Sequence, residues 1–155
     1  MTRPLLIIFL TIFVNLVGFG IIIPLLPFYA ETFGASPLVI GLLFAVFSAC
    51  QLVAAPVLGA WSDKYGRRPV LVFSLAGTVV SFVMLATATS ITMLFLARVV
   101  DGLSGGNIST ARAYVADVTE PKDRARAYGV IGAAFGLGFI MGPALSGVLA
   151  TISYT

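Results

Sequence analysis

Few residues in this chain could do chemistry, and the most unusual are charged residues inside apolar sequence. Arg98, Asp101 and Arg112 lie in the stretch 92–114, which is otherwise mostly apolar. If this stretch is one helix, a rotation of about 100° per residue places these three residues and Gly105 within a stripe roughly 60° wide. Arg98 and Asp101 are spaced i,i+3 and could simply neutralise each other to hold a bundle together. Alternatively, the stripe lines a water-filled path, because charges at membrane depth usually face a cavity or a partner.

The segment 59–68 is a second candidate for a functional role. It combines two glycines, one acid and three bases, which are Gly59, Gly66, Asp63, Lys64, Arg67 and Arg68. Gly59 would let another helix approach closely, and Gly66 would allow the positive-φ turn of a tight hairpin between two helices. Asp63 could cap a helix N-terminus nearby. The three bases by themselves could instead be the topology signal of an ordinary short loop.

The composition indicates that lipid surrounds most of the chain. Hydrophobic residues make up 59% of the 155 residues, charged residues make up 10%, and the mean hydropathy is +1.08. A soluble domain carries roughly 25% charged residues because it needs a wetted surface. The chain has no histidine and a single cysteine, Cys50, which excludes a disulfide framework and a Cys/His zinc cluster. No nucleophile–base set or phosphate loop is visible, so we expect no enzyme, no catalytic residue and no metal site.

Five apolar stretches are long enough to cross a bilayer, which takes about 20 helical residues. They cover about residues 5–29, 38–60, 70–88, 92–114 and 127–152. The first stretch is longer than the ~7–15-residue apolar core of a signal peptide, and Pro24 and Pro27 make a poor cleavage site, so we expect it to be retained. The sequence therefore predicts an all-α, polytopic membrane helix bundle.

The basic residues predict which side of the membrane each loop faces. One side of the alternating topology carries seven of them: Arg3, Lys64, Arg67, Arg68, Lys122, Arg124 and Arg126. The opposite loops carry none, and their only charge is Glu31. Positive loops stay in the cytoplasm, so the N-terminus is predicted to be cytoplasmic, and these bases do not indicate a nucleic-acid partner. Asp117 follows the fourth stretch on the same side, and we predict that it pairs with Arg67 or Arg68 unless it is merely a solvated charge.

The fifth stretch is rich in glycine on one side of its predicted helix. That side holds no bulky side chain, since it consists of Gly129, Gly132, Gly136, Pro143 and Gly147. Such a surface lets another helix pack closely. Proline also removes one backbone hydrogen bond from a helix, so we expect a kink at Pro143.

Two of these segments resemble motifs of the major facilitator superfamily (MFS) of transporters. The segment 59–68 resembles the family's loop between helices two and three, with a glycine, then Asp-Lys, then Gly-Arg-Arg. Arg98-Val-Val-Asp101-Gly102 resembles the Arg-x-x-x-Gly motif of its fourth helix. The resemblance implies a fold of two six-helix halves, of which this chain would be the first five helices and hence an N-terminal portion. It also implies that the segment 59–68 and Asp117 latch the cytoplasmic side.

Two further stretches resemble the drug/proton antiporters within that family. The run from Gly18 to Pro27 resembles their first helix. Their fifth-helix motif is resembled by the set Gly132, Gly136, Gly142, Pro143 and Gly147. The resemblance implies proton-coupled export of a small organic or drug-like solute across a bacterial inner membrane, with Arg98, Asp101 and Arg112 in proton coupling. It implies no cofactor besides the proton gradient, and it makes the lipid bilayer, the solute and the missing C-terminal half the partners.

Polar residues in the other stretches are weaker candidates for the solute path. Asn15 and Gln51 are the better substrate-contact candidates, whereas Ser74, Thr78 and Ser81 can face inward as packing residues. The chain resembles tetracycline/proton antiporters closely, and there the positions of Asn15 and Ser81 carry acids. Both are neutral here, which argues against tetracycline as the solute and against a proton path through these two positions.

Two functions other than transport by a longer protein fit the sequence. The chain could be a non-transporting membrane protein that binds a partner through its glycine face. It could also be a half-transporter that dimerises around a central path. Further apolar helices encoded downstream of Thr155, with a second glycine-rich cytoplasmic loop, would favour the longer transporter, and a stop codon there would favour the other two.

Overall fold

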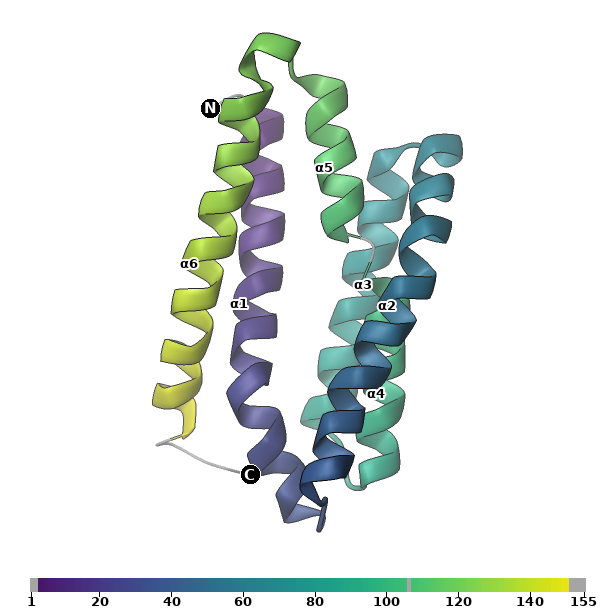
Figure 1. The fold of residues 1–155 in the computed structure, drawn as a ribbon, viewed down its shortest axis with the longest axis vertical. Coiled ribbons are helices and arrows are strands. Elements are labelled where there is room, and N and C mark those ends of the chain that lie inside the picture. Colours follow the sequence, from purple (N-terminus) through teal and green to yellow (C-terminus); the bar gives the residue numbers. More distant parts are fainter. Residues whose placement is uncertain (1–2, 106, 151–155) are drawn as a thin grey trace. The chain divides into compact units, whose positions relative to one another are not determined.

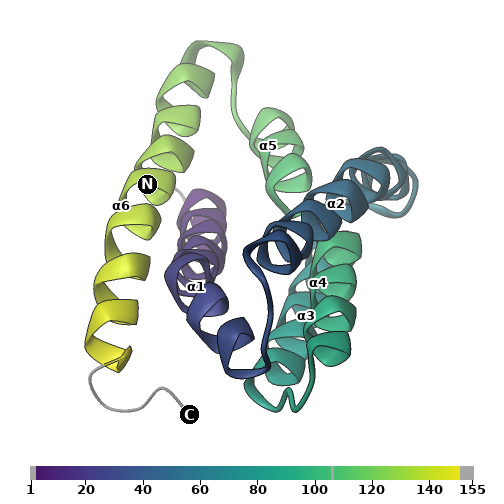
Figure 2. The same cartoon turned by 60° about the horizontal axis from the view of Figure 1, so that its bottom comes forward.

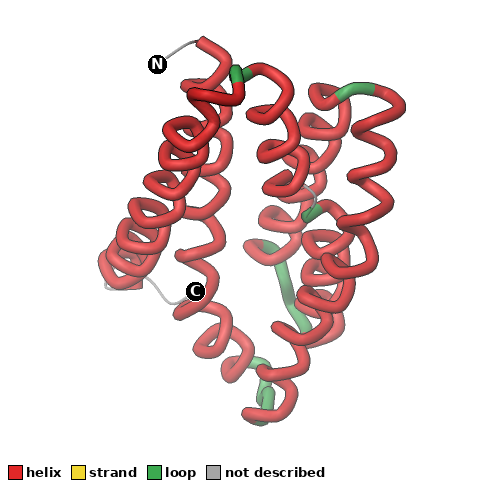
Figure 3. The backbone as a smooth tube through the Cα atoms, turned by 45° about the horizontal axis from the view of Figure 1, so that its top comes forward, coloured by secondary structure: helices red, strands yellow, loops and turns green. Residues whose placement is uncertain are grey.

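The structure is a computed structural model that describes residues 3–105 and 107–150. It consists of α-helices joined by short loops, with no strand in the described part, and this confirms the all-α prediction (Figure 3). The elements in order are α1 (Arg3–Thr32), α2 (Pro37–Tyr65), α3 (Arg67–Ala86), α4 (Ile91–Ser104), α5 (Asn107–Val118), the 3-10 helix η1 (Pro121–Asp123) and α6 (Arg124–Ala150) (Figure 1). Residues 151–152, the end of the fifth predicted stretch, lie outside the described residues.

Four described segments are long and apolar enough to cross a membrane. They are Leu6–Thr32, Pro37–Tyr65, Arg67–Ala86 and Pro121–Leu149. These segments contain the first, second, third and fifth predicted stretches nearly entirely. Their outward-facing apolar side chains, such as Leu52 at 77% exposed and Ile140 at 69%, suit contact with lipid rather than water.

The fourth predicted stretch, 92–114, is not one continuous helix. α4 ends at Ser104 and α5 begins at Asn107, and at 14 and 12 residues neither piece is long enough to span a bilayer alone. The sequence has two consecutive glycines at this break, and each glycine inside a helix costs about 1 kcal/mol relative to alanine. The Gly105 amide donates to the Gly102 carbonyl at 3.1 Å, so the last turn of α4 tightens before the chain leaves the helix. Gly106 itself lies outside the described residues.

Glycine and serine set the ends of the helices. Gly66, between α2 and α3, has a φ of +94°, which confirms the predicted positive-φ turn of this hairpin. Gly34 has a φ of +77° in the turn after α1. Ser36 and Ser90 are the N-cap residues of α2 and α4, and each side chain accepts a hydrogen bond from the amide three residues later.

The chain divides into two compact units, and each is described by itself. The first consists of residues 1–29 and 111–155 and contains most of α1, most of α5, η1 and α6. The second consists of residues 30–110 and contains α2, α3 and α4. The predicted fourth stretch is therefore shared between the two units.

In the first unit, α1 and α6 run side by side in backbone contact (Figures 1 and 2). A Cβ built on Gly142 would lie 2.6 Å from the Cα of Gly20, and one built on Gly138 would lie 2.6 Å from the Cβ of Leu16. The rings of Phe19 and Phe139 meet edge to face nearby, with centroids 6.3 Å apart. Small residues allow this approach because no side chain separates the two backbones.

The contact divides the predicted glycine motif of α6 into two sets with different surroundings. Gly142 and Pro143 face Gly20 of α1. A Cβ built on Gly132, Gly136 or Gly147 would meet no described atom within 4 Å. These three glycines do not make the α1–α6 contact, so their open side stays available to another helix.

In the second unit, α4 packs against both α2 and α3. Gly102 of α4 sits against the backbone of Phe47 and the side chain of Cys50 on α2, where a Cβ would come within 2.6 Å. Gly77 of α3 sits against the Ser104 side chain of α4. Close packing at these two points brings the polar residues of α4 against its neighbours.

We expect Gly142→Ala to lower the stability of the first unit, because the new methyl group would overlap the Gly20 backbone. Overpacking of this kind costs about 1–3 kcal/mol. The measurement is the thermal unfolding midpoint in detergent. The control is Gly129→Ala on the same helix, where the methyl group enters open space. Equal midpoints for the two variants would contradict the packing described for α1 and α6.

Candidate functional site

The centre of the second unit holds a buried ion pair. Arg98 and Asp101 lie one turn apart on α4, and their side chains are 0% and 7% exposed. The Arg98 Nη2 and the Asp101 Oδ2 are 3.2 Å apart. The predicted pairing of these two residues is confirmed. An arginine at membrane depth costs at least about 2.5–3.5 kcal/mol, so its neutralisation by Asp101 is what permits burial here.

Two residues from neighbouring helices complete the surroundings of this pair. Phe47 of α2 lies under the Arg98 guanidinium, whose central carbon is 5.5 Å from the ring centroid. Thr78 of α3 is buried beside the Asp101 carboxylate. The contact with Asp101 is an ion pair and not a hydrogen bond, and no other described residue accepts a hydrogen bond from the Arg98 Nε, Nη1 or Nη2 atom. The guanidinium is thus held by charge and by an aromatic face, and its donors remain able to bind an anion or water.

The α3 face towards α4 is lined by small hydroxyl residues. Ser74, Thr78 and Ser81 are all buried, which confirms that they face inward. The Ser81 hydroxyl donates to the Ala97 carbonyl at 2.9 Å, one residue before Arg98. Ser81 therefore supports the α4 backbone.

Of the two predicted substrate contacts, Gln51 has a structural partner. Its Nε2 donates to the Gly105 carbonyl at 3.3 Å, which satisfies a free acceptor where α4 ends. Asn15 is half-buried on α1, and its contact with a solute stays a prediction.

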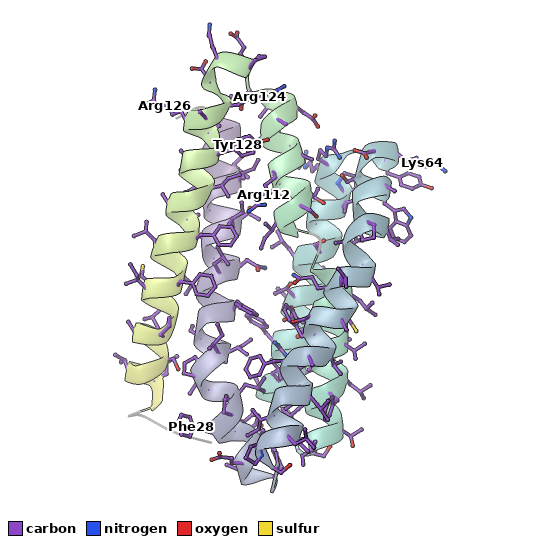
Figure 4. All side chains as sticks on the ribbon, viewed as in Figure 1. Phe28, Lys64, Arg112, Arg124, Arg126 and Tyr128 are labelled. Carbon is purple, nitrogen blue, oxygen red and sulfur yellow. The ribbon has the colours of Figure 1, made fainter. Side chains whose placement is uncertain are left out.

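Arg112 lies on α5 in the first unit, whereas Arg98 and Asp101 lie on α4 in the second. The single helix that the predicted stripe assumes ends at Ser104, so a common face for the three residues stays a prediction. Arg112 lies beside α6, where Tyr128 donates from its hydroxyl to the Arg112 carbonyl at 3.4 Å (Figure 4). The two arginines of the fourth stretch therefore occupy separate environments.

The segment 59–68 forms the end of α2, the turn at Gly66 and the start of α3. Asp63 pairs with Arg67, and Arg67 also donates to the Ser62 hydroxyl. The prediction that Asp63 caps a helix is wrong, because Asp63 lies inside α2 and no side chain caps α3. Gly59 does not mark a close helix approach in the described chain either, since a Cβ there meets nothing within 4 Å.

The other bases of this segment are exposed. Lys64 lies over the ring of Tyr65, with its Nζ 5.2 Å from the centroid, and Arg68 is exposed at the start of α3 (Figure 4 labels Lys64). Asp117 belongs to the first unit and the arginines to the second. The predicted pair of Asp117 with Arg67 or Arg68 therefore stays a prediction.

One role in the first unit was not predicted from the sequence. Arg124, at the start of α6, donates to the carbonyls of Ala116 and Thr119 at 3.0 and 3.4 Å (Figure 4). Both carbonyls lie at the end of α5, where a cation is favourable and acceptors are unpaired. The sequence signal for this role is a base soon after a predicted helix end, a pattern that also indicates membrane topology.

Comparison with known protein families identifies the family of this chain. Residues 8–155 match the Major Facilitator Superfamily. The chain belongs to this family. The helices and the four segments that are long and apolar enough to cross a membrane agree with this family.

Similar proteins include several drug-resistance proteins. The tetracycline resistance protein class H of Pasteurella multocida is 36% identical over 99% of this chain, and that of class C from Escherichia coli is 39% identical over 97%. Multidrug resistance protein 2 of Bacillus subtilis is 35% identical over 90%. The chain spans 39% of the length of each of the two tetracycline resistance proteins and 35% of the third relative.

We expect Asp101→Ala to destabilise the second unit strongly, because it leaves the Arg98 charge buried without a partner. Removing one member of a buried ion pair costs about 3–5 kcal/mol. Replacing both residues, by Arg98→Met and Asp101→Leu, should restore much of the loss. The measurement is the unfolding midpoint on titration with a denaturing detergent, and a single variant as stable as the wild type would contradict the role of the pair.

Proposed function

We propose that the protein containing this chain exports a small organic or drug-like solute in exchange for protons. The observation that carries this proposal is the buried cluster of Arg98, Asp101 and Thr78 in an otherwise apolar unit. Family membership supports transport, and the resistance proteins among the relatives support export of drug-like solutes. The proton gradient would be the energy source, and no other cofactor is needed.

The chemistry of the cluster suits proton exchange. Asp101 is the only acid in the described part of α2, α3 and α4 that is buried. Its carboxylate lies beside Arg98, which is charged, and Thr78, which is neutral. Addition of a proton to Asp101 would therefore weaken its ion pair with Arg98. A released Arg98 has free donors for water or an anion, and this alternation couples protonation to a change of contacts.

The positive residues support a cytoplasmic N-terminus and a cytoplasmic location for the segment 59–68. In a bacterial cell the protein would lie in the inner membrane, with this side towards the cytoplasm. Within this arrangement Asp117 would pair with Arg67 or Arg68 to hold the cytoplasmic side closed. The rest of the transporter would complete the path, and the open side of Gly132, Gly136 and Gly147 is suited to contact it.

Asp101→Asn should abolish proton-driven transport while the protein still folds. The amide keeps the size and one oxygen of the carboxylate and so changes the packing around Arg98 less than alanine does, but it cannot gain or lose a proton. The measurement is the collapse of a pH gradient when ethidium is added to vesicles carrying the full-length protein. Transport unchanged from the wild type would remove Asp101 from the mechanism.

A cysteine at Lys64 should react with a membrane-impermeant maleimide in inverted vesicles and not in intact cells. The experiment uses a Cys50→Ala background so that the new thiol is the only one in this chain. Glu31 is exposed at the end of α1, next to the start of α2, whereas Lys64 is near the end of α2. Glu31→Cys should therefore react in intact cells and not in inverted vesicles. Labelling of the Lys64→Cys protein from outside intact cells would contradict the proposed orientation.

A further inference from the structure

The first unit contains a hollow of about 470 Å³ between α5 and α6. It is lined by one base, two aromatic residues, one aliphatic residue and one glycine, which are Arg112, Tyr128, Phe135, Ile131 and Gly132. Its volume lies within the range of roughly 300–1,000 Å³ that is usual for small-molecule sites. Figure 4 shows Arg112 and Tyr128 next to each other on the two helices that form it.

The charge of Arg112 is not neutralised by the described part of the chain. Its guanidinium forms no ion pair or hydrogen bond with a described residue. Asp117, the acid on the same helix, is five residues away and so points about 140° around α5. Arg124 is engaged by the end of α5, and Glu120 pairs with Lys122 at 2.8 Å. Arg112 is therefore an uncompensated cation in an otherwise mostly apolar stretch.

The other walls of the hollow suit an apolar body. The Tyr128 hydroxyl uses its proton on the Arg112 carbonyl, which fixes its ring beside the arginine and leaves its oxygen as an acceptor. Ile131 and Phe135 add apolar surface one and two turns along α6 from Tyr128. Gly132 keeps the wall open, since a Cβ there would meet nothing within 4 Å.

We propose that this hollow binds an amphiphilic organic anion, with the anionic group on Arg112 and the apolar or aromatic body against Tyr128 and Phe135. A guanidinium can hold a carboxylate, sulfonate or phosphate through two parallel hydrogen bonds. The same chemistry occurs in a transported organic anion and in the headgroup of an anionic phospholipid. The inference rests on the proposed function only where it makes the hollow a subsite of the solute path.

The test measures binding to the full-length protein in detergent by equilibrium dialysis. The probes are naphthalene-2-sulfonate and 2-naphthylmethylammonium, which share a ring system and differ in charge. We expect the wild type to bind the anion at least tenfold more tightly than the cation. Arg112→Gln should weaken binding of the anion by roughly tenfold or more, as loss of a charged hydrogen-bond partner does. Arg126→Gln, which removes an exposed base outside the hollow, should leave binding within about twofold.

A second pair of variants tests the hollow without changing its charge. Gly132→Leu places a side chain inside the hollow and should also reduce binding of the anion. Gly129→Leu puts the same side chain on the same helix, in open space and outside the lining, and should have little effect. Arg112-independent binding, or equal effects of the two leucine variants, would overturn the proposal.

The source of the anion is decided by two further measurements. If vesicles loaded with naphthalene-2-sulfonate show Arg112-dependent flux, the ligand is a transported solute. If phosphatidylglycerol, and not phosphatidylcholine, displaces the probe in mixed micelles, the ligand is a lipid headgroup. Either result supports the anion site. Binding without any proton-coupled flux would contradict the proposed function and support the anion site. Proton-coupled flux without Arg112-dependent binding would contradict the anion site and support the proposed function.

Discussion

A buried arginine is the constraint on which the second unit depends. Arg98 is fully buried among helices whose outer surfaces are apolar, so its charge must be met from inside. Asp101 provides the opposite charge, Phe47 an aromatic face and Thr78 a polar side chain beside the acid. The packing of α4 against α2 and α3 brings these four side chains together, and it does so through glycines that allow close contact. Charge burial and helix packing are therefore parts of one arrangement.

Glycine has different functions at different places in this chain. Gly66 permits a positive φ in the turn between α2 and α3. Gly20 and Gly142 remove the side chains that would separate α1 from α6. Gly132 lines a hollow and touches no described atom at the Cβ position. The structural role of a glycine in a membrane helix can thus be assigned only when the residues packed against it are known.

The two arginines of the fourth stretch have opposite surroundings. Arg98 is buried and paired, whereas Arg112 is exposed to a hollow and has no acidic partner among the described residues. A paired charge can respond to protonation of its partner, and an unpaired one attracts a ligand of opposite sign. The break between α4 and α5 puts these two positions on different helices.

The sequence by itself determined the membrane location, the helical class, the Gly66 turn and the Arg98–Asp101 pair. These follow from local quantities, namely apolar length, glycine conformation and i,i+3 spacing. Only the tertiary structure decided that the fourth stretch is broken, that Arg98 and Arg112 lie on different helices, and that Gly142 and Gly132 have different neighbours. Such outcomes depend on which backbone meets which side chain across helices distant in sequence. Helical periodicity predicts which face of its own helix a residue lies on, and it does not predict which residues of another helix pack against that face.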